Sequence, residues 1–229
     1  MIESNPEAKM RDPEALIFDM DGVLVDSEPL HKRAKELAFA EIGLALPEGI
    51  YNSYKGRPDR TMMPEVLRAY GRTADTERVL LRKKEIYEEI EHEVQAIAGA
   101  AEFVRWAATR FRLALATSAT PRNRAAALRM LGMDDCFQSI VDTDRFQRPK
   151  PDPEVFQLAM RDLALRPEQC WIIEDSIAGV GAGKAAGAFT VGITTTFDRQ
   201  TLLAAGADLV VESFKELQHR IESKLEADL

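Results

Sequence analysis

The sequence predicts an α/β protein with a Rossmann-like parallel sheet, helices on both faces of that sheet, and a small all-helical domain inserted into it. Short apolar runs typical of buried strands alternate with stretches of helical periodicity along most of the chain. Between Glu28 and about Gln95 the alternation stops, and only helical patterns remain. This segment is therefore expected to fold as a separate unit, joined to the sheet by two linkers.

Six apolar runs predict the strands, at residues 16–18, 113–116, 140–141, 171–173, 189–193 and 209–211. Helical patterns between them cover residues 100–110, 122–131, 153–165 and 177–186. Two helix boundaries carry capping signals. Asp152 precedes Pro153 at an expected first helical position, and Gly132 follows the end of the helix at 122–131.

The inserted segment has its strongest helical pattern at residues 76–97, where apolar side chains recur at helical spacing and Lys83 stands on the same stripe. We therefore divide the chain into a flexible tail at 1–12, an α/β core at 13–27 and 96–229, and a helical cap at 28–95. In open α/β sheets, ligands bind beyond the carboxyl ends of the strands, and the insertion begins at such an end. We expect it to act as a lid.

Composition and charge exclude several classes of protein. The 229 residues carry a net charge of −8, with acidic and basic residues mixed and no long Lys/Arg run that would favour nucleic acid. No apolar stretch approaches the ~20 residues of a membrane span, and the polar beginning of the chain lacks the apolar core of a signal peptide. The two cysteines, Cys136 and Cys170, suit a reducing compartment. We expect a cytoplasmic protein, and nothing in the sequence requires more than a monomer.

Two carboxylates, Asp19 and Asp21, directly follow the first predicted strand, and Gly22 comes next. Like charges this close repel each other and lose solvation when they are partly buried. A divalent cation between them offsets both effects, because hard cations prefer oxygen ligands. The alternative is an ordinary strand end that turns through Asp-Gly. Polar residues farther along the chain favour the cation.

The second strand in sequence, at 113–116, ends in Thr117 and Ser118. Their hydroxyls and backbone N–H groups, near the beginning of a helix, suit a phosphate oxygen. Taken alone, the pair is equally well explained as a helix N-cap. Lys150 then stands in a stiff segment with prolines at 149, 151 and 153. A rigidly placed lysine suits an anion or a carboxylate cluster, whereas a lysine in a surface loop is usually solvated.

The strand at 171–173 again ends in adjacent carboxylates, Glu174 and Asp175, and Ser176 follows them. Alone, each of these acids is explained as a helix cap. The carboxyl ends of parallel strands lie along one edge of the sheet, so this edge would receive four acids, counting Asp19 and Asp21. Such a concentration of negative charge strengthens the case for a bound cation.

Taken in order, Asp19/Asp21, Thr117, Lys150 and Glu174/Asp175 resemble the four motifs of the haloacid dehalogenase superfamily of phosphohydrolases. The resemblance covers nearly the whole chain after the tail, and the insertion resembles the helical cap of the first cap class (subfamily I). Residues 26–31 (Asp-Ser-Glu-Pro-Leu-His) and 150–156 (Lys-Pro-Asp-Pro-Glu-Val-Phe) are typical of its β-phosphoglucomutase-like group of sugar-phosphate phosphatases and mutases. Relatives usually have proline directly before the glycine that stands here at position 99, whereas this chain has Ala98. We expect this departure to affect the hinge.

The resemblance implies a Mg²⁺-dependent phosphohydrolase that works through an aspartyl-phosphate. Asp19 is then the nucleophile, and the Asp21 side chain protonates the leaving oxygen and later activates the acceptor. The residues implied to bind the phosphoryl group are Thr117, Ser118 and Lys150. The implied magnesium ligands are Asp19, Asp175, the backbone carbonyl of Asp21, and Glu174 directly or through water.

Three functions remain open at this point. The first is a phosphatase for a small phosphorylated metabolite, for which a sugar phosphate is the favoured substrate. The second is a mutase such as β-phosphoglucomutase, in which a second sugar hydroxyl replaces water as the acceptor. The third is a non-catalytic protein that binds a phosphorylated metabolite as a regulator. Descendants of that last kind usually lose the nucleophile or the second acid, and this chain has both.

Residues of the insertion bear on the choice between the first two. His31 matches a mutase histidine that couples cap closure to Asp21, and Lys83 matches a cap lysine, but Asp59 stands where the mutase has a cap arginine. A surface position for His31 and snorkelling of Lys83 along its stripe are the alternatives. A basic turn is expected either to recognise the leaving group of the substrate or to be a solvated loop; its residues are Tyr54, Lys55, Gly56, Arg57 and Arg60.

Overall fold

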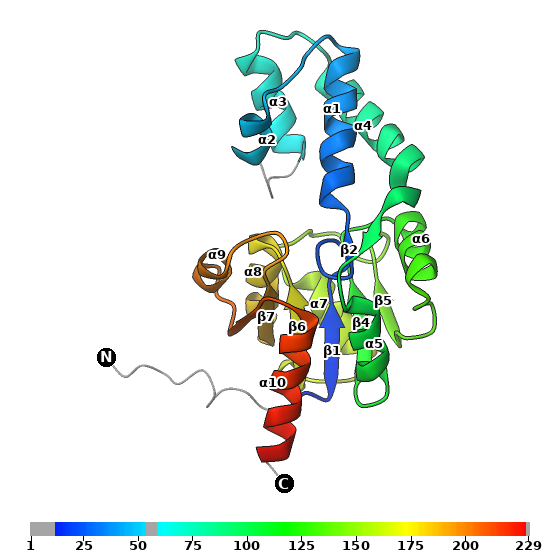
Figure 1. The fold of residues 1–229 in the computed structure, drawn as a ribbon, viewed down its shortest axis with the longest axis vertical. Coiled ribbons are helices and arrows are strands. Elements are labelled where there is room, and N and C mark those ends of the chain that lie inside the picture. Colours follow the sequence, from blue (N-terminus) through cyan, green and yellow to red (C-terminus); the bar gives the residue numbers. More distant parts are fainter. Residues whose placement is uncertain (1–11, 54–58, 228–229) are drawn as a thin grey trace, which may run out of the picture. The chain divides into compact units, whose positions relative to one another are not determined.

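The computed structural model describes residues 12–53 and 59–227 and divides the chain into two compact units (Figure 1). One unit comprises Met1–Asp26 with Ala96–Leu229, and the other comprises Ser27–Gln95. The linkers carry two short strands, β2 (Val25–Asp26) and β3 (Gln95–Ala96), which form a two-stranded sheet. Among the described residues, no helix is both long and apolar enough to cross a membrane.

The larger unit is built on a six-stranded sheet in which neighbouring strands run parallel. In spatial order its strands are β5 (Ser139–Val141), β4 (Arg112–Ala116), β1 (Ala15–Phe18), β6 (Cys170–Glu174), β7 (Phe189–Ile193) and β8 (Leu209–Val211). All six predicted strands are present, and the predicted α/β class is confirmed. Strand β1 lies between β4 and β6, so the chain returns to both sides of its first strand.

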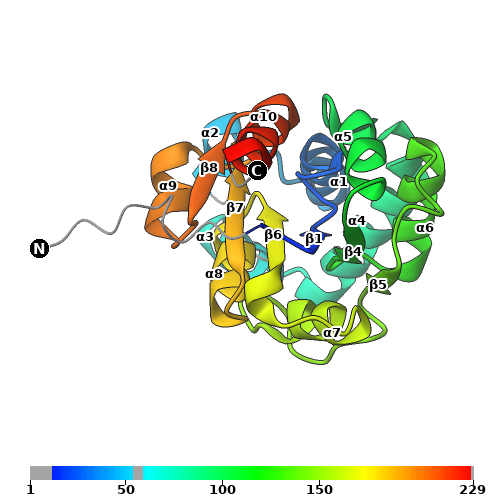
Figure 2. The ribbon, with the colours of Figure 1, turned by 90° about the horizontal axis from the view of Figure 1, so that it is seen from below.

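Helices cover both faces of this sheet, as Figure 2 shows from below. On one face, Val155 and Phe156 of α7 and Ala182 of α8 pack in one buried cluster with Ile17 of β1. On the other face, the ring of Phe18 lies 6.1 Å from that of Phe103 in α5. The helices of the larger unit are α5 (Ala100–Ala108), α6 (Pro121–Leu131), α7 (Glu154–Asp162), α8 (Ile177–Ala185), α9 (Arg199–Ala204) and α10 (Phe214–Ala227), with a 3₁₀ turn η3 (Pro167–Gln169).

Helix boundaries match the sequence expectations with small corrections. Gly132 ends α6 in the left-handed conformation, with φ 62°, as expected for a C-cap glycine. Helix α7 begins one residue later than predicted, because Pro153 is the N-cap and not the first helical residue. Asp152 still contributes, since its Oδ1 accepts a hydrogen bond of 3.0 Å from the backbone N–H of Glu154.

The smaller unit is helical, as the sequence pattern indicates. It consists of α1 (Glu28–Glu41), α2 (Glu48–Ser53), α3 (Asp59–Ala69), α4 (Thr76–Ile90) and the 3₁₀ turn η2 (Glu91–Glu93). The helical pattern at 76–97 predicts a longer helix than the structure has, because α4 ends at Ile90. The unit has a hydrophobic core of its own, in which Phe39, Met63 and Ile86 are buried. It therefore has the apolar interior expected of a compact folding unit.

Candidate active site

Three neighbouring strands place the predicted site residues at the carboxyl edge of the sheet. Phe18, the last residue of β1, stands in register with Leu115 of β4 and Ile173 of β6. The next residue, Asp19, donates its backbone N–H to the Ile173 carbonyl at 3.0 Å, which extends the ladder by one bond. Acids that are far apart in sequence therefore meet because β1 lies between β4 and β6.

The carboxylates of Asp19, Glu174 and Asp175 come together at this edge. An oxygen of each lies within 4.8 Å of an oxygen of the others, and all three residues are buried. Burial raises the pKa of Asp19 to about 7, although the charge of Lys150 lowers it. Burial and the neighbouring carboxylates of Glu174 and Asp19 raise the pKa of Asp175 well above its ordinary value. Burial therefore disfavours the charged forms of both acids.

Among the described residues, Lys150 is the cation that pairs with this cluster. Its Nζ lies 2.6 Å from Asp19 Oδ1 and 2.7 Å from Glu174 Oε1, and it also donates to the Ala116 carbonyl at 3.1 Å. Burial alone would lower the pKa of Lys150, but Asp19 and Glu174 outweigh that effect and raise it. The lysine is therefore a fixed positive charge, and the solvated-loop alternative is wrong.

Glu174 has hydrogen-bond partners on both of its carboxylate oxygens. Oε1 accepts from Lys150, while Oε2 accepts from the backbone N–H groups of Asp175 and Ser176 and from the Ser176 hydroxyl, at 2.9–3.1 Å. A Cβ at Gly179 would lie 1.8 Å from the Glu174 carboxylate, so the first turn of α8 packs directly against it. This arrangement suits a contact from Glu174 to a cation through water better than a direct one.

The loop after β1 brings the backbone close to Asp175. The Met20 carbonyl accepts hydrogen bonds from the N–H groups of three following residues, Val23, Leu24 and Val25, which closes a tight turn. Gly22 has φ +76°, and a Cβ there would lie 1.9 Å from Asp175 Oδ2. Asp21, the fourth predicted acid, lies outside the group of three carboxylates whose oxygens come within 4.8 Å of one another. After burial and Glu174, its charge also raises the pKa of Asp19, so its side chain lies near the cluster.

Thr117 lies at the end of β4, completely buried, and its backbone N–H donates to the Val141 carbonyl at 2.9 Å. Its hydroxyl accepts a hydrogen bond from the N–H of Ala119 at 3.0 Å. The N-cap of α6 is Thr120, whose side chain accepts from the N–H of Asn123, so the N-cap interpretation of Thr117 and Ser118 is wrong. Ser118 is exposed beside Thr117, which leaves it accessible to a ligand.

Within the helical unit, the buried Lys83 forms a polar cluster with His31 and Asp59, which are partly exposed. The Lys83 Nζ lies 2.7 Å from Asp59 Oδ2 and 3.1 Å from His31 Nδ1. The His31 ring stacks on Tyr87 with centroids 4.2 Å apart. Lys83 therefore pairs inside the unit and does not snorkel to solvent, and His31 is not a simple surface residue. Burial alone would raise the pKa of Asp59, but Lys83 and Lys35 lower it.

The basic turn that was predicted to recognise the leaving group is only partly described. Tyr54, Lys55, Gly56 and Arg57 lie outside the described residues. Arg60 is exposed in the first turn of α3.

The stability of the helical unit should depend on pH through His31. Burial, reinforced by Lys83 and Lys35 and opposed by Asp59, lowers the pKa of His31 to about 3 from an ordinary 6.5. The unfolded chain then takes up this proton first, so stability present above pH 6.5 is lost as the pH falls toward 3. As the pH falls, the free energy of unfolding of the wild type should decrease more steeply than that of His31→Gln. The two slopes should differ by at most about 1.4 kcal/mol per pH unit.

Chemical denaturation followed by circular dichroism at several pH values between 7 and 4 measures this difference. His92, which is exposed in the same unit, provides the matched control His92→Gln, and this variant should keep the wild-type slope. Equal slopes for His31→Gln and wild type would show that the His31 ring is not held neutral by the fold.

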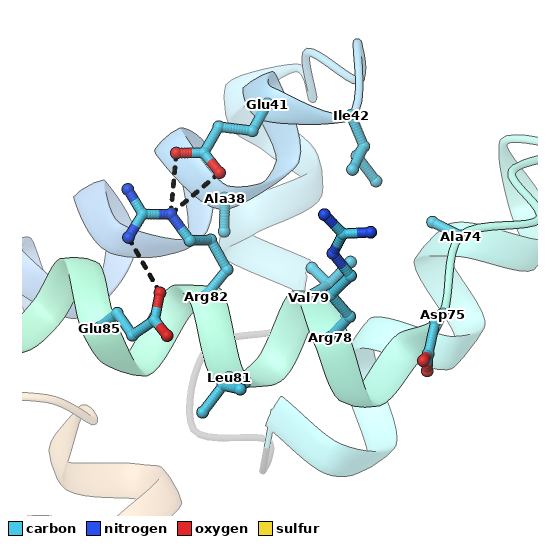
Figure 3. Close-up of a pocket in the computed structure, with 10 residues that line it drawn as sticks. All are labelled: Ala38, Glu41, Ile42, Ala74, Asp75, Arg78, Val79, Leu81, Arg82 and Glu85. Carbon is cyan, nitrogen blue, oxygen red and sulfur yellow. Dashed lines mark hydrogen bonds and ion pairs between the residues drawn. The ribbon is translucent and has the colours of Figure 1, made fainter.

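A groove of about 490 Å³ runs between α1 and α4 in the helical unit (Figure 3). Ala38, Arg78 and Val79 are among the residues that line it, and Arg82 beside them pairs with Glu41 at 3.0 Å. Among the residues that the structure describes, none that belongs to the predicted site lines this groove. It therefore adds no support to the proposed chemistry.

Two residues that contact the site were not predicted from the sequence. Thr195 donates its hydroxyl to the Gly22 carbonyl, and the Thr196 hydroxyl is hydrogen-bonded to the Asp175 carboxylate. Thr194 separates both residues from the predicted strand at 189–193. The signal that identified Asp19, Thr117 and Glu174, namely a polar residue immediately after a buried strand, points to Thr194 and does not single out Thr195 or Thr196.

Comparisons with known proteins agree with this geometry. A family model described as haloacid dehalogenase-like hydrolase matches residues 13–187. A phosphorylated carbohydrates phosphatase from Thermotoga maritima is 36% identical over 205 residues, which cover 87% of this chain and 94% of the relative. The β-phosphoglucomutase of Bacillus subtilis is 30% identical over 212 residues, covering 89% and 91%. A crystal structure of a candidate β-phosphoglucomutase from Thermotoga maritima superposes with a TM-score of 0.77 at 32% identity, covering 92% and 99%.

Proposed function

Because the chain belongs to the haloacid dehalogenase-like hydrolases, within their group of β-phosphoglucomutases and sugar-phosphate phosphatases, we propose that it hydrolyses a small phosphorylated metabolite with Mg²⁺ and through phosphorylation of Asp19. A sugar phosphate is the substrate class that we propose. One observation carries the proposal: Lys150 bridges Asp19 and Glu174 at an edge where Asp175 also converges. A carboxylate nucleophile, a fixed cation and a cluster of oxygen ligands are the parts that phosphoryl transfer needs.

The carboxylate cluster suits a magnesium ion. Its donors are hard carboxylate oxygens, which Mg²⁺ prefers, and among the described residues three buried carboxylates share the single lysine Lys150. Asp19 and Asp175 are the proposed direct side-chain ligands, with the Asp21 carbonyl and with Glu174 through water. When bound, Mg²⁺ would neutralise phosphate charge and so reduce the repulsion between phosphate and Asp19.

Each remaining residue has a role in the proposed reaction. Asp19 attacks phosphorus, forms an acyl phosphate and displaces the alcohol oxygen, which takes a proton from Asp21. Asp21 then removes a proton from water, and the water oxygen attacks the acyl phosphate to release inorganic phosphate. Lys150 balances charge on the transferring group, Thr117 offers its hydroxyl to the oxygens of that group, and Ser118 offers its hydroxyl and backbone N–H.

Transfer to a second sugar hydroxyl is the alternative function. The similarity to a named β-phosphoglucomutase and the paired His31 and Lys83 favour it. Asp59 disfavours it, because an acid occupies the place of the mutase cap arginine and pairs with Lys83 at 2.7 Å. A purely regulatory role is disfavoured because both Asp19 and Asp21 are present. We therefore place hydrolysis first.

A screen over phosphorylated metabolites tests the proposal. With Mg²⁺ present, we expect phosphate release from a generic aryl phosphate and faster release from one or more sugar phosphates. The panel includes β-glucose 1-phosphate, for which both released phosphate and isomerised sugar phosphate are measured. Isomerisation that outpaces release would identify the mutase instead. Binding without any turnover would identify the regulator.

A further inference from the structure

The turn that follows β7 lies next to the end of β6, where Asp175 stands. Glu174 is in register with Gly192 of β7, so the residues after these two strands are neighbours. This turn contains three consecutive threonines at 194–196. It is anchored at its beginning, because the Thr194 backbone N–H donates to the Val211 carbonyl at 3.0 Å. The side chains of Thr195 and Thr196 are thereby held at the edge of the site.

The two later threonines contact different parts of the site. The Thr195 hydroxyl donates to the Gly22 carbonyl in the loop that carries Asp21. A Cβ added to Gly22 would lie 1.9 Å from Asp175 Oδ2 and 3.0 Å from Thr196 Oγ1. The loop after β1, the Asp175 carboxylate and the Thr196 hydroxyl therefore lie together around Gly22.

The contact between Thr196 and Asp175 has a chemical consequence. Asp175 is buried, and the Thr196 hydroxyl is hydrogen-bonded to its carboxylate. In the ionised form that binds a cation, the Asp175 carboxylate accepts and does not donate, so the Thr196 hydroxyl is the donor in that form. A β-branched side chain has few χ1 rotamers, which makes the direction of this donor well defined. Hydrogen bonds of this kind fix the orientation of metal-binding carboxylates and tune the affinity for the ion.

We propose that Thr196 is a positioning residue whose hydroxyl fixes the side chain of Asp175, so that a carboxylate oxygen is directed toward a divalent cation shared with Asp19. The inference rests on the proposed function, because that function requires the cation. Thr196 touches neither substrate nor the reacting atoms in this role and acts through Asp175. Its effect should therefore appear in metal affinity before it appears in the rate at saturating metal.

Three variants separate this role from a general effect on the turn. Thr196→Val keeps the shape and removes the donor, Thr196→Ser keeps the donor, and Thr194→Val removes a hydroxyl from the same turn as a matched control. Mg²⁺ affinity is measured by isothermal titration calorimetry on the full chain without substrate. Melting temperature in metal-free buffer and the Mg²⁺ dependence of aryl phosphate hydrolysis are measured alongside.

We expect Thr196→Val to weaken Mg²⁺ binding by about 10- to 100-fold, with a matching rise in the half-saturating Mg²⁺ concentration and a smaller change in kcat. Thr196→Ser should recover most of the wild-type affinity, and Thr194→Val should retain it. Wild-type affinity in Thr196→Val, or an equal loss in Thr194→Val, would overturn the inference while leaving the proposed function intact. A wild-type protein that binds no Mg²⁺ would overturn both.

Discussion

Asp19→Asn should lower kcat for an aryl phosphate on the order of 10⁴-fold, without lowering the melting temperature. An amide lacks the negative charge that makes the carboxylate a nucleophile, and loss of a covalent nucleophile removes the main route of the reaction. The fold should tolerate the change. The amide oxygen can still accept a hydrogen bond from Lys150, whose Nζ lies 2.6 Å from Asp19 Oδ1, and one of three crowded buried carboxylates is neutralised.

A matched control for this variant is Asp144→Asn, because Asp144 is exposed in the same unit. It should keep wild-type kcat and melting temperature. Steady-state kinetics with Mg²⁺ and thermal unfolding measure both quantities. An Asp19→Asn variant with more than a small fraction of wild-type activity, after exclusion of deamidation by mass spectrometry, would show that another group attacks phosphorus.

Lys150→Met should destabilise the metal-free protein by about 3–5 kcal/mol, because removal of one partner from a buried ion pair leaves the other charge unpaired. Here one lysine is within 2.7 Å of two acids, Asp19 and Glu174, and all three side chains are at most 10% exposed. For a chain of this size, the loss corresponds to a fall in melting temperature on the order of 10 °C. Activity should also be lost, because Lys150 neutralises charge on the transferring group.

The chain offers a matched control for Lys150 in a second lysine–aspartate pair. Lys184 Nζ lies 2.6 Å from Asp208 Oδ2, but the lysine side chain is 35% exposed. Lys184→Met should therefore cost only about 0–1 kcal/mol. Thermal unfolding of both variants with and without Mg²⁺ completes the experiment. Because bound cation adds positive charge to the same carboxylates, Mg²⁺ should recover part of the stability lost in Lys150→Met. Equal losses in the two variants would contradict the description of Lys150 as the buried counter-charge.

The core of the site was predictable because its signals are local. Asp19, Thr117 and Glu174 each follow a short apolar run directly, and parallel strands bring such positions to one edge. Lys150 was identified from the stiffness of its proline-rich segment, with an anion or a carboxylate cluster as the expected partner. The pairing with Asp19 itself was not predicted, because Asp19 is 131 residues away in sequence. Only the strand order and register bring the two together.

Longer-range pairings limited the prediction elsewhere. Thr195 was missed because its partner, Gly22, is 173 residues away, and hydroxyl groups in a turn are usually satisfied by solvent or by local backbone. The pairing of Lys83 with Asp59 was missed for a related reason. A lysine on an apolar stripe is explained by snorkelling, and only the packing of α3 against α4 brings an acid within 2.7 Å.

The most direct measurement is to locate the phosphoryl group on the enzyme during turnover. Wild-type protein is mixed with Mg²⁺ and aryl phosphate, quenched in acid and treated with borohydride, which reduces an aspartyl-phosphate to homoserine. Peptide mass spectrometry then reads the position. We predict homoserine at position 19 in wild type and none in Asp19→Asn. Homoserine at another acidic residue would contradict the proposal that Asp19 accepts the phosphoryl group. The absence of homoserine from a sample that had consumed substrate before the quench would contradict it too.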